Sequence, residues 1–137
     1  MDLNKLIIEI EKIKDWELKR LKHLVSKHDD IIIIGNGGSN SIASHIAQDY
    51  TKCLDKRAIS FSDPSRLTCY INDYGRDNAY MEFLKDFCNK ETLVILISSS
   101  GNSMNIVNAA KYCDKTFTEY VALSGFEEDN KLIWHQV

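Results

Sequence analysis

The sequence carries little net charge and contains no long apolar run, and both absences exclude classes of function. Its 17 basic and 20 acidic residues give a formal charge of −3, without a block of like charge, so nucleic-acid binding has no electrostatic support. No segment approaches the roughly 18 apolar residues of a membrane span. Residues 1–20 have acidic side chains throughout and no uninterrupted apolar core, unlike a signal peptide. We therefore expect no nucleic acid and no membrane as partners.

Paired cysteine motifs are also lacking. The chain has four widely spaced cysteines, Cys53, Cys69, Cys88 and Cys113, with no CxxC motif, and each lies in or beside an apolar segment. This usage is typical of reduced thiols in a cytosolic protein, so we expect a cytoplasmic location. With 137 residues, of which 44% are hydrophobic, the chain can bury one core. A second domain is not expected.

The first part of the chain has a helical pattern. Apolar residues recur mostly at steps of three and four over residues 3–25: Leu3, Leu6, Ile7, Ile10, Ile13, Leu21, Leu24 and Val25. This spacing predicts one long amphipathic helix within residues 1–28. At roughly six turns it exceeds what a domain of this size needs to cover one face of a sheet. We therefore expect part of its apolar stripe to contact another subunit.

Short apolar runs alternate with helical patterns over residues 29–125. The runs at 31–34 and 93–97 are continuous, as in parallel strands buried on both faces. Further strands are predicted at 57–61 and 119–123, and helices at 39–53, at 104–113 and in two pieces around 72–75. This alternation predicts a three-layer α/β fold with a mostly parallel sheet, Rossmann or flavodoxin-like. Residues 126–137 follow as a tail that either folds back or leaves its neighbouring strand to a partner.

The loop richest in hydroxyl groups follows the strand at 93–97 directly. Residues 98–103 read Ser-Ser-Ser-Gly-Asn-Ser and lead into a helix. Ligands of open parallel sheets bind beyond the carboxyl ends of the strands, and serine hydroxyls with N–H groups at a helix start can hold a phosphate dianion without Lys or Arg. The alternative is a Ser-rich turn with Asn102 or Ser103 as a simple N-cap. Because a buried strand precedes the loop, we favour phosphate binding.

A second loop, Gly35-Asn36-Gly37-Gly38-Ser39, follows the strand at 31–34. It is not a dinucleotide-binding fingerprint, because Asn stands at position 40 where a third Gly would be needed, and it is not a P-loop, because no GK[ST] follows. Its glycines let the backbone approach a ligand closely, and Asn36 offers an amide to sugar hydroxyls. On its own this loop is less specific than the serine loop.

Four motifs together resemble the sugar-isomerase (SIS) domain of bacterial phosphoheptose isomerases. They are Gly35-Asn-Gly-Gly-Ser39, His45 with an acidic residue four positions later, Ile71-Asn-Asp-Tyr-Gly75, and Ser98-Ser-Ser-Gly-Asn-Ser103. Their order and spacing match over roughly residues 30–125. The resemblance implies an aldose–ketose isomerase of a phosphorylated sugar, most like the interconversion of sedoheptulose 7-phosphate and a heptose 7-phosphate. It also implies a homotetramer with active sites at subunit contacts.

The resemblance implies a role for each matching residue. The implied substrate contacts are Asn36, Gly37, Gly38, Ser39, Asn72, Asp73, Ser98, Ser99, Ser100 and Ser103. His45 and Asp49 take the positions of two zinc ligands, the acidic one also serving as an acid/base group. Their i,i+4 spacing puts both on one helix face, although the same pair could be a solvated one on a surface helix. Asp stands where the family has Glu, which shortens the side chain by about 1.5 Å.

The sequence departs from the family pattern after residue 125. The family continues into a long C-terminal helix whose Gln and His complete the zinc site and supply the second acid/base group, and no segment here matches it. Two other interpretations therefore stand beside the isomerase. One is a non-catalytic phosphosugar-binding or protein-binding SIS module, and the other is a truncated product of a longer enzyme gene.

Overall fold

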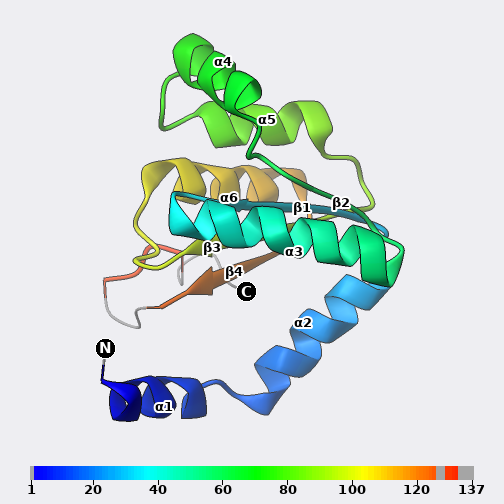
Figure 1. Ribbon diagram of the computed structural model, residues 1–137. Coiled ribbons are helices and arrows are strands. Elements are labelled where there is room, and N and C mark those ends of the chain that lie inside the picture. The colour runs from blue at the N-terminus through cyan, green and yellow to red at the C-terminus, as the bar shows by residue number, and fades with distance from the viewer. Residues whose placement is uncertain (1, 126–128, 133–137) are drawn as a thin grey trace.

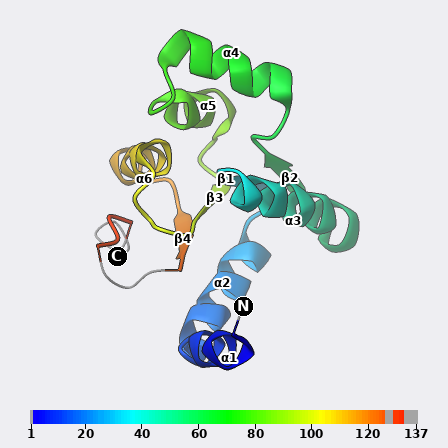
Figure 2. The same ribbon diagram turned by 60° about the vertical axis from the view of Figure 1, so that its left-hand side comes forward.

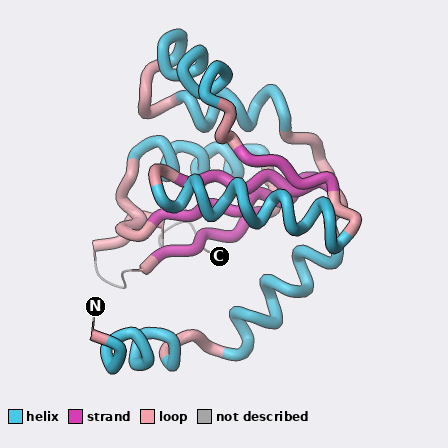
Figure 3. Tube along the Cα trace, viewed as in Figure 1, coloured by secondary structure: helices cyan, strands magenta, loops and turns pink. Residues whose placement is uncertain are grey.

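A four-stranded parallel sheet forms the middle of the computed structural model, which describes residues 2–125 and 129–132 (Figure 1). The strand order is β2-β1-β3-β4, and every neighbouring pair is parallel. Figure 3 shows the strands side by side with helices around them. The elements are α1 (Leu3–Glu11), α2 (Asp15–Lys27), β1 (Asp30–Gly35), α3 (Gly38–Leu54), β2 (Arg57–Ser60), α4 (Pro64–Tyr74), α5 (Ala79–Phe87), β3 (Thr92–Ser98), α6 (Met104–Thr116) and β4 (Tyr120–Ser124). The predicted strands and core helices are confirmed, with their ends shifted by a few residues.

The four isoleucines of β1 show why its sequence is apolar without a break. Successive side chains of a strand point to opposite faces of the sheet. Ile31 and Ile33 pack into one buried cluster with α2 and α3, whereas Ile32 and Ile34 pack into another with α5 and α6. All four are at most 2% exposed. The three-layer α/β architecture expected from the sequence is confirmed (Figure 2).

Helix α4 stands outside these three layers. It packs on α5, which separates it from the sheet in both ribbon views (Figures 1 and 2). Aromatic rings join it to the core: Phe61 contacts Tyr70 edge to face at 5.4 Å and stacks on Phe83 at 4.2 Å. The contact between α4 and the body therefore includes aromatic rings and lies on the face of the sheet that α5 and α6 cover.

The single long helix expected at the amino terminus is wrong, because the chain breaks there into α1 and α2. The backbone of Lys14 is extended, and the Glu17 carboxylate accepts a hydrogen bond from the Lys14 N–H at 2.9 Å, which starts a new helix. Helix α1 buries no residue and lies away from the sheet (Figure 1). Only the last turns of α2 join the core, through Leu24 and Val25.

The described part of the tail folds back onto the body. Leu132 is fully buried in the cluster that contains Leu96 and Ile106, and Asn130 is 2% exposed. Residues 126–128 and 133–137 lie outside the described residues, so the expectation for the tail is tested only at 129–132. No helix in the described part of the chain is long and apolar enough to cross a membrane.

Candidate active site

Two loops meet at the carboxyl edge of the sheet because β1 and β3 are neighbours. Gly35, the last residue of β1, pairs with Ile97 of β3, one residue before Ser98. The glycine loop (residues 35–39) and the serine loop (residues 98–103) therefore begin at the same level, each leading into a helix. This is the edge at which parallel sheets bind ligands, as the sequence predicts.

Two glycines of the first loop are required by its geometry. A Cβ at Gly35 would lie 2.6 Å from the backbone carbon of Ser39, so the chain comes too close to itself there for any side chain. Gly37 has φ +52° and precedes α3 as its N-cap. The carbonyl oxygen of Asn36 accepts from the N–H groups of Ser39 and Asn40 at 2.9 and 3.3 Å. The turn is thus tight, with its backbone exposed at Gly37 and Gly38.

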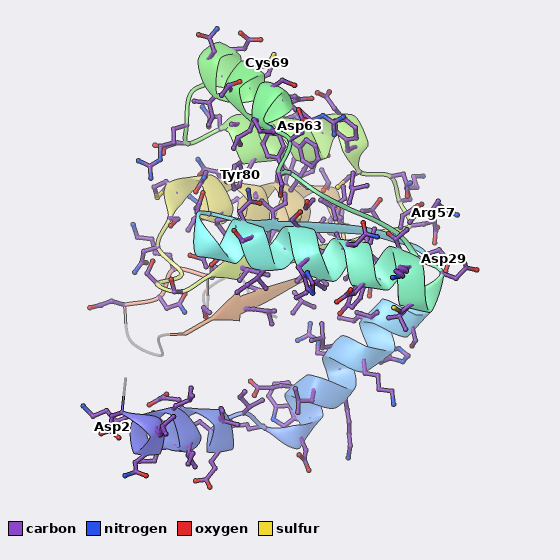
Figure 4. The ribbon with its side chains drawn as sticks, in the orientation of Figure 1. Asp2, Asp29, Arg57, Asp63, Cys69 and Tyr80 are labelled. Carbon is purple, nitrogen blue, oxygen red and sulfur yellow. The ribbon has the colours of Figure 1, made fainter. Side chains whose placement is uncertain are left out.

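The side chain of Asn36 belongs to a hydrogen-bonded group that sequence reasoning missed. Asn36 and Asn105 exchange amide hydrogen bonds of 3.0 and 2.8 Å, and the Tyr80 hydroxyl donates to Asn36 Oδ1 at 2.8 Å and to the Gly35 carbonyl oxygen at 2.9 Å. Tyr80 lies on α5, facing the sheet (Figure 4). Burial raises the pKa of Tyr80, which keeps its hydroxyl protonated as a donor.

This group fixes the spacing of the two loops, since Asn105 lies in the first turn of α6, two residues after the serine loop. The Asn36 side chain is engaged with the protein, and its role toward a sugar stays a prediction. The available signal was Asn105 itself, a polar residue among the buried apolar positions of α6. Tyr80 gave no such signal, because an aromatic residue in a helix most often serves the core.

In the serine loop, the hydroxyl groups divide into two that shape the loop and two that do not. Ser98 Oγ accepts from the Gly101 N–H and Ser100 Oγ accepts from the Asn102 N–H, both at 3.2 Å. Ser98 is buried, whereas Ser100 is half-buried. Ser99 is exposed, and Ser103 occupies the N-cap position of α6 without a capping hydrogen bond from its side chain. The Ser103 side chain therefore does not cap α6, and phosphate binding by the loop stays a prediction.

The pair His45 and Asp49 lies on the exposed face of α3. The His45 Nε2 and Asp49 Oδ2 atoms are 3.4 Å apart, and the side chains are 79% and 54% exposed. His45 also lines a shallow polar hollow of about 530 Å³ together with Asn40, Ser41, Ser44, Gln48 and Ser62. At 1.5 Å per residue, His45 stands roughly 10 Å along the helix from Gly38. The two side chains thus lie together on one face of α3, as their spacing predicts.

Zinc fits this pair only in part. Catalytic zinc sites use about three protein ligands, and His45 and Asp49 supply two. Within residues 2–125 and 129–132 no group of three or more His, Cys, Asp or Glu side chains could hold a metal ion. The described residues therefore do not make a zinc site by themselves.

Asn72 and Asp73 are not brought to the loops within this chain. They lie in the last turn of α4, where Asn72 Nδ2 donates to Asp73 Oδ1 at 3.0 Å and both side chains are exposed. The Asp73 carboxylate also accepts from the Cys69 thiol at 3.5 Å, which raises the pKa of Cys69. Because α4 lies outside the three layers, their contact with a substrate stays a prediction.

Comparison with known proteins identifies the fold and its family. A family model described as "SIS domain" matches residues 17–125. The chain belongs to the SIS domain family. Among its SIS relatives, the phosphoheptose isomerase of Fusobacterium nucleatum subsp. nucleatum is 36% identical over 116 residues, or 80% of this chain and 60% of that protein. That of Histophilus somni is 33% identical over 132 residues, or 90% and 67%.

A solved SIS structure agrees with the sequence comparison. The phosphoheptose isomerase GmhA of Neisseria gonorrhoeae superposes with a TM-score of 0.83 at 28% identity, covering 91% of this chain and 70% of that one. The resemblance drawn from the four motifs is therefore confirmed at the level of the family. The chain spans less than two thirds of the Fusobacterium protein's length. Similarity alone therefore does not assign the activity, substrate or assembly of the whole relatives to it.

Proposed function

We propose that this SIS domain binds a phosphorylated sugar and interconverts its aldose and ketose forms, with sedoheptulose 7-phosphate as the ketose. The serine loop carries the proposal: four hydroxyls and the start of α6 meet at the carboxyl end of a buried strand. The first N–H groups of a helix lack partners within the helix and favour an anion. The phosphoheptose isomerases among its relatives supply the choice of sugar.

The reaction moves one proton between neighbouring carbons. A base removes a proton from C1 of the ketose, the C1–C2 enediol forms, and a proton returns to C2 while the hydroxyl proton passes from O1 to O2. Binding of the phosphate fixes the positions of C1 and C2 relative to the catalytic groups. We assign the base to the Asp49 carboxylate, with His45 beside it at 3.4 Å. Both lie further along α3 than the loops, as an elongated substrate requires.

Zinc is part of this proposal, with His45 and Asp49 as two of its ligands. A bound zinc ion would polarise the sugar's oxygen atoms. Asp49 reaches about 1.5 Å less far toward such an ion than Glu would. The proton transfers do not require the metal. A titration with zinc alone tests it: the parent should bind more tightly than a His45→Ala variant, and equal affinities would remove zinc from the proposal.

The catalytic assignment is tested by turnover and binding of sedoheptulose 7-phosphate in the parent and in Asp49→Asn. We expect kcat to fall by about 10²-fold or more, with a nearly unchanged dissociation constant. Ser99→Ala should instead weaken binding about tenfold, as one hydrogen bond to a charged group does. Asp55→Asn is the matched control, because it makes the same change at the far end of α3, where Asn tolerates the φ of +55°.

A non-catalytic phosphosugar-binding SIS module is the second candidate. It is favoured by one observation: beside the serine loop, the described residues offer only the pair His45 and Asp49 as acid/base groups and no group of three metal ligands. The same experiment separates the two. Tight binding of sedoheptulose 7-phosphate without turnover in the parent would establish the binding module, and absence of binding would contradict both candidates.

We further propose that the chain acts as a homo-oligomer, a tetramer by its resemblance, in the cytoplasm. Large apolar side chains of α1 and α2 support an interface, since Leu3, Ile7, Ile10 and Trp16 are each more than half exposed. The four free cysteines suit a reducing compartment. Sedimentation of the purified chain should show a tetramer, and a monomer at micromolar concentration would contradict this assembly.

A further inference from the structure

The serine loop is held from outside by a short segment of the tail, residues 129–132, which we name the strap. The Asn102 side chain bonds it in both directions: its amide donates to the Asp129 carbonyl oxygen, and its Oδ1 accepts from the Lys131 N–H at 3.1 Å. One residue earlier, the Gly101 carbonyl oxygen accepts from the Leu132 N–H at 3.2 Å. Three hydrogen bonds thus join the strap to two consecutive residues of the loop.

Asn130 occupies the space that a side chain at position 101 would need. A Cβ at Gly101 would lie 1.7 Å from Asn130 Oδ1, and Gly101 has φ +66°. The Asn130 amide donates to Ser124 Oγ at 2.6 Å, and its Oδ1 accepts from the Leu132 N–H at 3.0 Å. Because Asn130 is 2% exposed and Leu132 fully buried, the strap is anchored in the core. Both the positive φ and the packing of Asn130 against position 101 therefore favour glycine there.

The strap contacts Gly101 and Asn102 and leaves three of the four serines of the loop accessible. Ser99 stays exposed, and Ser100 and Ser103 are half-buried. A loop of small, flexible residues loses conformational freedom when it binds a ligand, and this cost falls if the loop is ordered beforehand. A second contact supports the same conformation, since the Gly125 N–H donates to the Ser99 carbonyl oxygen at 2.9 Å.

We propose that the strap orders the serine loop for phosphate, with Asn102 and Asn130 as positioning residues that do not touch the ligand. This rests on the proposed function only in the identity of the ligand. The ordering itself is a property of the free chain. Truncating either side chain should therefore loosen the loop before any sugar is added and weaken phosphosugar binding afterwards.

Amide hydrogen exchange of the ligand-free chain tests the ordering. In Asn102→Ala and Asn130→Ala, exchange at the N–H groups of Gly101 and Leu132 should become about tenfold faster, as loss of one or two hydrogen bonds allows. Asn108→Ala is the matched control. It makes the same change in α6, where Asn108 donates to the Asp77 carbonyl oxygen at 3.0 Å, away from the strap. Its loop amides should exchange as in the parent.

Calorimetric titration with sedoheptulose 7-phosphate, well below the unfolding temperature of each variant, tests the consequence for binding. The dissociation constant should rise about tenfold in both strap variants and stay unchanged in Asn108→Ala. Folded strap variants with the parent's affinity would overturn the proposal, as would unchanged loop exchange. If the parent binds no sugar phosphate, the proposed function fails, and the exchange rates alone still decide whether the strap orders the loop.

Discussion

The two edges of the sheet are built from different chemistry. At the amino edge, ionised side chains pair with one another: Arg57 Nε lies 2.6 Å from Asp30 Oδ1, and Lys27 Nζ lies 2.6 Å from Glu119 Oε2. Figure 4 shows Asp29 and Arg57 at this edge. At the carboxyl edge, the loops offer hydroxyls, amides and backbone N–H groups. A hollow at the amino edge is lined mostly by charged residues, among them the paired Lys27, Asp30 and Arg57. The other edge presents neutral donors.

The amino edge serves stability. His28, which is buried, contacts the Glu91 carbonyl oxygen with Nδ1 at 2.8 Å and Glu119 Oε2 with Nε2 at 2.6 Å. It thereby ties the end of α2 to β4, two elements far apart in the sequence. Hydrogen bonds from Arg57 and then Asn89 hold the pKa of Asp30 below its usual value. Perturbed groups of this kind mark ion pairs as well as active sites, and here the geometry identifies ion pairs.

The carboxyl edge should be most sensitive to substitution at Gly35, where the backbone passes close to Ser39. Gly35→Ala places a Cβ 2.6–2.7 Å from backbone atoms of Ser39, so we expect a loss of about 3 kcal/mol in the free energy of unfolding. Urea denaturation measures it. Gly38→Ala is the control for stability, because a Cβ there meets nothing within 4 Å. Equal losses in the two variants would show that the crowding at Gly35 is relieved elsewhere.

Tyr80→Phe makes a smaller change at the same edge of the sheet. The variant keeps the ring in the core but removes the hydroxyl that donates to Gly35 and Asn36 at 2.9 and 2.8 Å. We expect a loss of about 1–2 kcal/mol in the free energy of unfolding. Tyr120→Phe is the matched control, since its hydroxyl donates to the Asp114 carboxylate at 3.0 Å nearer to solvent and should lose less. The reverse order would contradict a structural role for the Tyr80 group.

The fold was predictable because its signals are local. Four consecutive isoleucines and the run at 93–97 predict buried parallel strands wherever they occur, and both lie in the middle of the sheet. The break between α1 and α2 was not predictable from periodicity. Apolar residues keep the helical spacing as far as Ile13, which lies beyond the end of α1 at Glu11. It depends on the capping contact of Glu17 with the Lys14 backbone, which competes with a continuous helix.

Sequence motifs predicted where the two loops and the His45–Asp49 pair lie, but not the contacts that hold the loops in place, nor the position of Asn72 and Asp73 on α4. The two loops and the His45–Asp49 pair lie where sequence spacing puts them. The bond between Asn36 and Asn105 joins residues 69 positions apart, and that between Asn102 and the Lys131 N–H joins residues 29 apart. Contacts of this range depend on which strands are neighbours, so they follow from the assembled sheet and not from any single motif.

The smallest effect we predict is at the amino edge and depends on pH. Lys27 first, and then His28, lowers the pKa of Glu119 below its ordinary value of 4.5. A carboxyl whose pKa is lower in the folded state stabilises the fold above its unfolded pKa, and this stabilisation is lost as the pH falls through the folded pKa.

Because the Glu119 side chain is 44% exposed, its pairs should contribute less than about 1 kcal/mol. Glu119→Gln should thus be slightly less stable than the parent at pH 7. In denaturation series the difference should shrink as the pH falls below 4.5 and vanish once Glu119 is protonated in the folded state. Glu91→Gln, which contacts His28 through its backbone oxygen, should match the parent throughout. A difference for Glu119→Gln that persisted at low pH would mean that packing, and not charge, makes this edge stable.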